Sequence, residues 1–273
     1  MVTIIQAIIL GIVQGLTEFL PVSSSAHLVI IPYLFGWKLD EAVVFPFDVL
    51  VQLGTLAAVI YYFRRDLWEI LSAVWNGLRS GKPFGAPAAR LGWLLVLATI
   101  PAGVIGLLIK DLVEAVFKDA PVTALFLLVT ALLLIIAEKI GKRSRGIASL
   151  TWKDALWIGF AQALALFPGI SRSGATISGG MSRNLDRPAA ARFSFLMSIP
   201  VMLAAGAFSL LDLLDIPNLA SLLPAIAAGF IAAAVVGYFA IRWLLAFLTR
   251  RPLYIFAAYC AALAIVVLLV AYV

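Results

Sequence analysis

The side chains that could do chemistry are concentrated near the N-terminus, in residues 11–27. This stretch holds the only histidine of the chain, His27, together with Glu18 and the serine cluster Ser23–Ser25. A serine hydroxyl becomes a nucleophile when a base takes its proton, and histidine titrates near neutral pH and can be that base. An acid inside an apolar segment is costly and therefore indicates function.

The spacing of these residues indicates how they are grouped. Gln14 and Glu18 are four residues apart and share one helix face, while Ser24 and His27 are three apart and share a face of a helix that begins near Ser23. We expect Ser24 to be the nucleophile or to position the attacking water, and His27 to be its base. Glu18 would orient the imidazole or hold a divalent ion, with Gln14 and Ser23 in support.

The same stretch recurs 148 residues later, in residues 159–174. Gly11 falls on Gly159, Gln14 on Gln162, Leu16 on Leu164, Phe19 on Phe167, Ser23 on Ser171 and Ser25 on Ser173, and the pair Phe45 and Phe47 falls on Phe193 and Phe195. The two copies carry different polar residues, because the second has Arg172 at the position of Ser24.

The second copy has the composition of an anion site. Arg172 is flanked by Ser171, Ser173 and Thr176 at the predicted start of a half-helix. A guanidinium, hydroxyls and helix N-terminal N–H groups together favour phosphate. Folded against the first copy, this cradle indicates phosphoryl transfer or hydrolysis on a lipid-borne phosphate.

The composition places this chemistry in a membrane. Hydrophobic residues make up 64% of the chain and charged residues 12%, whereas soluble domains have about 45–50% and about 25%. The apolar runs are long and unbroken, which is typical of membrane helices and not of the alternating strands of a barrel. We therefore expect an all-α integral membrane protein, with residues 1–273 in a single membrane domain.

Six apolar runs are long enough to be full transmembrane helices: 45–63, 91–109, 121–137, 193–211, 222–241 and 253–272. The segments 3–36 and 154–182, which hold the two copies, are too polar and too broken for clean spans. Their breaks fall at Pro21 and at Pro168-Gly169. We expect each segment to be a re-entrant pair of half-helices, because broken backbone at membrane depth must line a cavity or lie inside the protein.

The charges of the loops predict the orientation. Basic loops are expected in the cytoplasm and mixed or acidic loops outside. The basic loops are 64–90, 139–153, 183–192 and 242–251. The mixed or acidic loops are 38–44, 110–120 and 212–221. The helices alternate sides only if both broken segments are re-entrant, which leaves both termini outside. Residues 1–140 and 150–273 are then inverted-topology repeats, a plan in which half-helix ends meet near the membrane midplane.

Three motifs in this order resemble those of one known family. They are Gln14-Gly15-Leu16-Thr17-Glu18, Pro21-Val22-Ser23-Ser24-Ser25-Ala26-His27, and the run from Pro168 to Thr176. Over essentially its full length the chain is similar to the bacterial undecaprenyl-diphosphate phosphatases, also called bacitracin-resistance proteins. It departs from their pattern at Ser25-Ala26, where the family commonly has Thr-Gly, and at Gln14, where the family also allows glutamate. The glutamine weakens any mechanism that needs two carboxylates.

The resemblance implies a reaction and a place. The reaction is hydrolysis of a C55 polyprenyl diphosphate to the monophosphate, which recycles the lipid carrier of cell-wall synthesis and confers bacitracin resistance. The place is the bacterial cytoplasmic membrane, with the active site open to the outer, periplasmic side. The resemblance also implies a divalent cation, Mg or Ca, for which Glu18 and Gln14 are a thin ligand set. The expected partner is the lipid and not a nucleic acid, and a homodimer stays open.

Two other functions fit part of the pattern. An inverted repeat with a midplane anion site is also the architecture of transporters, so a flippase or transporter for a polyprenyl phosphate is the alternative. Such a protein would not need the combination of Glu18, His27 and Ser24. Lipid phosphatases of the acid-phosphatase type require two catalytic histidines, and this chain has one.

Overall fold

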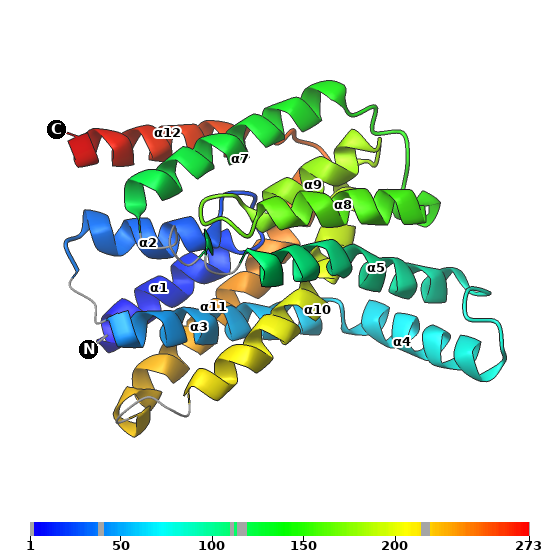
Figure 1. Ribbon diagram of the computed structural model, residues 1–273, viewed down its shortest axis with the longest axis horizontal. Helices are drawn as coiled ribbons and strands as arrows, with labels where there is room; N and C mark the ends of the chain where they lie inside the picture. Colours follow the sequence, from blue (N-terminus) through cyan, green and yellow to red (C-terminus); the bar gives the residue numbers. More distant parts are fainter. Residues whose placement is uncertain (1–2, 38–40, 110–111, 114–118, 214–218, 273) are drawn as a thin grey trace.

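A computed structural model describes residues 3–37, 41–109, 112–113, 119–213 and 219–272, and within these ranges the chain is helical, with no strand beyond one isolated bridge (Figure 1). Its elements are α1 (Ile4–Thr17), α2 (Ser24–Leu34), α3 (Glu41–Tyr62), α4 (Arg64–Arg79), α5 (Pro87–Leu108), α7 (Ala120–Ile140), η1 (Ile147–Ser149), α8 (Trp152–Leu164), α9 (Arg172–Ser182), α10 (Arg187–Leu213), α11 (Leu219–Leu248) and α12 (Tyr254–Tyr272).

Several helices are suited to crossing a membrane. By length and composition 5 of the described helices qualify, namely α5, α7, α10, α11 and α12, and the number rises to 6 if α3 and α4 form one span bent by 75°. The protein is therefore a multi-pass helical membrane protein. All six predicted runs are helical, although the run 45–63, now α3, does not qualify without α4.

The expectation that 64–90 is entirely a loop is wrong, because Arg64–Arg79 forms α4. Four large side chains of this helix recur at intervals of three and four residues and are exposed: Trp68, Leu71, Trp75 and Leu78. Ile70 is buried. This amphipathic period was hidden in the sequence by the surrounding arginines and by the glycines and prolines that follow. Of the loops expected outside, 38–44, 110–120 and 212–221, residues 38–40, 110–111, 114–118 and 214–218 lie beyond the described residues. Residues 41–44, 212–213 and 219–221 are helical, as the ends of α3, α10 and α11, so the first and the last of these loops are shorter than expected.

Both predicted helix breaks are present, and local chemistry explains each one. Ser23 precedes α2 with φ of 68°, and its side chain accepts a hydrogen bond from the Ala26 N–H. In the second copy Gly169 has φ of 101°, and a Cβ there would collide with the Thr123 carbonyl. The Thr130 hydroxyl then donates to the Gly169 carbonyl and accepts from the backbone N–H of Ser171, the residue that caps α9. The chain is therefore anchored where it turns back.

Each broken segment packs against a helix of the other half. The α1 helix lies on α11, and α8 lies on α5. Gly11 and Gly159, which are repeat equivalents, make these contacts close, because a Cβ on either would overlap a backbone carbonyl of the neighbouring helix, at Gly229 or at Ala98. Figure 1 shows both breaks near the middle of the molecule. They touch there, since the Ser173 hydroxyl donates to the Leu20 carbonyl at 2.9 Å.

A buried aspartate holds the far end of the α8–α9 hairpin. Asp154, in the first turn of α8, accepts hydrogen bonds from Arg145, Arg183 and Thr151. Burial alone would raise the pKa of its carboxyl, but these hydrogen bonds outweigh burial and hold the pKa well below its usual range. The hairpin is therefore tied to the loop before it and to the end of α9, which keeps Arg172 in place at the other end.

Candidate functional site

An ion pair between the two halves forms the centre of the site. Arg172 Nη2, at the start of α9, lies 3.0 Å from Glu18 Oε1, just after α1. Their side chains are 15% and 4% exposed. In the sequence Arg172 has no acidic neighbour that could pair with it. The structure supplies one across the repeat and confirms that the two copies meet.

The second carboxylate oxygen of Glu18 accepts two more hydrogen bonds. Gln14 Nε2 donates at 2.9 Å and Ser24 Oγ at 2.5 Å. Gln14 also reaches the hydroxyl of Thr55 on α3 at 3.3 Å. We expected Ser24 to pair with His27, and the structure pairs it with Glu18 instead. The reason is the break at Pro21, which folds the start of α2 back against the end of α1 and so brings Ser24 to the acid.

His27 has a different set of partners from the one we expected. Its Nδ1 lies 2.7 Å from the carbonyl oxygen of Ser23, and its Nε2 lies 2.7 Å from the hydroxyl of Tyr259 on α12. The imidazole and phenol rings are nearly parallel, with centroids 5.6 Å apart. The expectation that Glu18 orients the imidazole is therefore not met. Tyr259 was missed because it lies in an apolar run that carries no motif.

The hydroxyls of the predicted phosphate cradle are already engaged. Ser171 caps the N–H of Gly174 at 3.0 Å. Thr176 donates to the carbonyl of Arg172 at 2.7 Å and shares a hydrogen bond of 2.6 Å with the hydroxyl of Ser194, a residue that the motifs did not indicate. Together with the bond of Ser173 to Leu20, these contacts build and dock the start of α9. Arg172 is thus the best-placed donor for an anion.

The residues of the site do not fit a resident divalent cation. Among the described residues no group of three or more His, Cys, Asp and Glu side chains could hold a metal ion. Mg²⁺ and Ca²⁺ prefer at least six oxygen ligands, usually including several carboxylates. Glu18 is a single carboxylate that a guanidinium already neutralises. We therefore assign no step of the chemistry to a protein-held metal.

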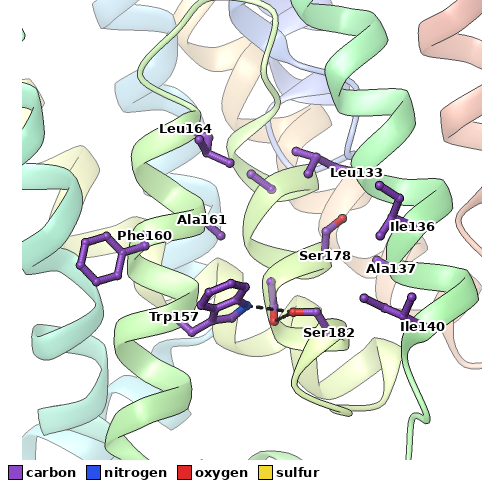
Figure 2. Close-up of a pocket in the computed structure, with 12 residues that line it drawn as sticks. Leu133, Ile136, Ala137, Ile140, Trp157, Phe160, Ala161, Leu164, Ser178 and Ser182 are labelled. Carbon is purple, nitrogen blue, oxygen red and sulfur yellow. Dashed lines mark hydrogen bonds between the residues drawn. The ribbon is translucent and has the colours of Figure 1, made fainter.

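A separate hollow of about 360 Å³ lies between α7, α8 and α9 (Figure 2). Leucine, isoleucine, alanine and aromatic side chains line most of it. At one end Trp157 Nε1 donates to the Ser182 hydroxyl at 2.9 Å. None of the predicted site residues lines this hollow. Its apolar lining offers no charged group to a phosphate.

Comparisons with known proteins place the chain in one family. The family model described as bacitracin resistance protein BacA matches residues 7–266. An undecaprenyl-diphosphatase of Myxococcus xanthus is 45% identical over 266 residues, which cover 97% of this chain and 88% of the relative. An undecaprenyl-diphosphatase of Chlorobaculum tepidum is 47% identical over 93% of this chain and 92% of the relative. Undecaprenyl-diphosphatase 1 of Corynebacterium jeikeium is 46% identical over 97% of this chain and 93% of the relative.

The buried ion pair predicts how the two charges contribute to stability. Arg172→Met leaves Glu18 charged and unpaired, and breaking such a pair from one side costs about 3–5 kcal/mol of unfolding free energy. Glu18→Gln in the same chain removes the stranded charge. The double variant should therefore unfold closer to the unsubstituted protein than Arg172→Met does, in thermal melts of detergent-solubilised protein. If the losses of unfolding free energy in Arg172→Met and in Glu18→Gln simply add up in the double variant, the two residues are not coupled.

Proposed function

The chain belongs to the bacitracin resistance protein BacA family, and we propose that it removes the terminal phosphate of undecaprenyl diphosphate. The products are undecaprenyl monophosphate and inorganic phosphate, so the lipid carrier of cell-wall synthesis is returned to use. The family name implies bacitracin resistance. The observation that carries the reaction is the serine hydroxyl held by a buried carboxylate beside an arginine, at Ser24, Glu18 and Arg172.

Substrate binding begins at Arg172 in this proposal. A phosphate group offers several oxygens to the planar guanidinium, which suits a bidentate contact. The terminal phosphate therefore competes with Glu18 for the same cation. Arg172, which lies 3.0 Å from Glu18, turns from that carboxylate to the phosphate and so exchanges one anion for the other.

The exchange prepares the nucleophile. When Arg172 turns to the phosphate, Glu18 loses its cation and becomes a better acceptor for the proton of Ser24, whose hydroxyl it already holds. The Ser24 Oγ attacks the terminal phosphorus as its proton passes to Glu18, and the bond from phosphorus to the bridging oxygen breaks. Undecaprenyl monophosphate leaves, and water then releases the phosphate from serine. If Ser24 positions the water instead, that water attacks the terminal phosphorus directly.

The transport alternative uses fewer of the observed contacts. A flippase for a polyprenyl phosphate would need the anion site at Arg172 and the reciprocal packing of the two halves. It would not need a hydroxyl held by a carboxylate, and the relatives carry the name of a phosphatase. Hydrolysis therefore accounts for more of the site.

A phosphate-release assay tests the function. Purified protein given C55 diphosphate should release inorganic phosphate, and Ser24→Ala should lower turnover by about 10²–10⁴, the usual worth of assisted proton transfer. Ser178→Ala removes a buried hydroxyl of α9 outside the cluster and is the matched control. A parallel series with chelator tests the cation requirement that the family resemblance implies. No release from the unsubstituted protein would refute the function, whereas near-normal turnover of Ser24→Ala would refute only the role of serine.

We also propose that the two halves are inverted in the cytoplasmic membrane and that the site opens to the periplasmic side. The reciprocal packing of α1 on α11 and of α8 on α5 supports the repeat. The basic residues around Asp154 support a cytoplasmic position for that end of the α8–α9 hairpin, which leaves the other end, with Arg172, toward the outside.

Cysteine labelling from outside intact cells tests this orientation. In a Cys260→Ala background, Ser144→Cys should stay unlabelled by an impermeant maleimide, because residue 144 lies in a basic loop. Asp119→Cys, at the start of α7, should be labelled. Labelling at residue 144 with protection of residue 119 would reverse the assignment.

A further inference from the structure

Tyr259 belongs to none of the motifs, yet its hydroxyl lies 2.7 Å from the only histidine of the chain. We propose that Tyr259 is a catalytic proton relay, through which His27 takes a proton from the hydrolytic water and later returns it. This inference rests on the proposed function, because it concerns the water step of the same reaction.

The protonation of His27 follows from its two partners. A carbonyl oxygen can only accept a hydrogen bond, so Nδ1, at 2.7 Å from the Ser23 carbonyl, must carry a proton. In the neutral imidazole Nε2 is then the free base and accepts the hydroxyl proton of Tyr259. The nitrogen that could act as a base is thus already connected to one specific donor.

Burial makes Tyr259 the route to that nitrogen. His27 is 4% exposed. Both nitrogens of its ring have partners, so a proton enters or leaves the free nitrogen Nε2 through the hydroxyl of Tyr259. A phenol oxygen can accept one proton while it donates another, which is what a relay requires.

The relay is held where the two copies of the repeat meet. Cys260, the next residue of α12, is buried, and its thiol donates to the carbonyl of Pro21 at 3.7 Å. Pro21 is the break between α1 and α2. Ser24, one helical turn before His27, faces the same side of α2. Tyr259, bonded to His27, therefore lies against the same turn of α2 that carries Ser24.

The protons of the water step move between the water, Tyr259, His27, Glu18 and Ser24. The water gives a proton to the Tyr259 oxygen as Tyr259 gives its own to His27 Nε2, and the water oxygen forms the new bond to phosphorus. The bond from phosphorus to the Ser24 oxygen breaks, and that oxygen recovers its proton from Glu18. The imidazolium then returns its proton through Tyr259 to the departing phosphate.

The test compares two tyrosines of one helix. Tyr259→Phe keeps the ring and removes the hydroxyl, and Tyr254→Phe makes the same change elsewhere on α12, at a residue that is 43% exposed. With C55 diphosphate, Tyr259→Phe should lower kcat by about 10² with KM within about twofold. Tyr254→Phe should match the unsubstituted protein. A kcat of Tyr259→Phe within twofold of the unsubstituted value would overturn the relay.

A double variant separates a relay from a packing role. If Tyr259 acts through His27, then His27→Ala/Tyr259→Phe should be no slower than His27→Ala alone, because the two residues act as a unit. Losses that multiply would mean two independent roles and would contradict the proposal. If Tyr259→Phe does not fold, Tyr259→His replaces it in the test. The introduced imidazole can accept and donate a proton, so Tyr259→His should retain at least tenfold more activity than His27→Ala. If the unsubstituted protein releases no phosphate, the proposed function itself fails.

Discussion

The structure depends on two opposite charges that meet inside a membrane protein. Either charge alone would be costly when buried, and among the described residues Glu18 and Arg172 have each other as ion-pair partner. The two residues are 154 positions apart, so the pair forms only when the two broken segments come together. The glycine contacts of α1 and α8, the threonine that anchors the second break, and the aspartate at the far end of α8 all serve that meeting. The same requirement places the hydroxyl of Ser24 beside the carboxylate of Glu18.

The two copies of the repeated stretch form similar half-helix pairs with different polar side chains. In the first copy Gln14 hydrogen-bonds to Glu18. In the second copy the equivalent Gln162 is buried, but neither polar atom of its side chain has a partner among the described residues, and the position of Glu18 is taken by Leu166. The second copy thus keeps the fold of the half-helix pair and contributes a cation, while the first contributes the acid, the serine and the histidine. Each half is incomplete without the other.

Features set by local chemistry were predictable from the sequence. Pro21, Gly169 and the capping serines mark both breaks, and the cluster of Glu18, Ser24 and Arg172 was expected because the two broken segments were predicted to fold against each other. The hydrogen-bond partners within the cluster were not predictable from the sequence. That Ser24 bonds to Glu18 and not to His27 depends on the angle at which α2 folds back on α1, which no periodicity encodes. Tyr259 is one aromatic residue in an apolar run, and it contacts His27 only because α12 passes the first break. The α4 helix was hidden because its charged residues resemble those of a basic loop.

The central claim is that the substrate takes Arg172 away from Glu18. The most direct measurement is a phosphorus–nitrogen distance from solid-state NMR, with arginine labelled with ¹⁵N and a non-hydrolysable prenyl diphosphonate bound to the protein in lipid. The account predicts that the terminal phosphorus lies in direct contact with a guanidinium nitrogen, and that the signal is lost in Arg172→Lys. A guanidinium of Arg172 that remains on Glu18, with the phosphonate bound elsewhere, would contradict it.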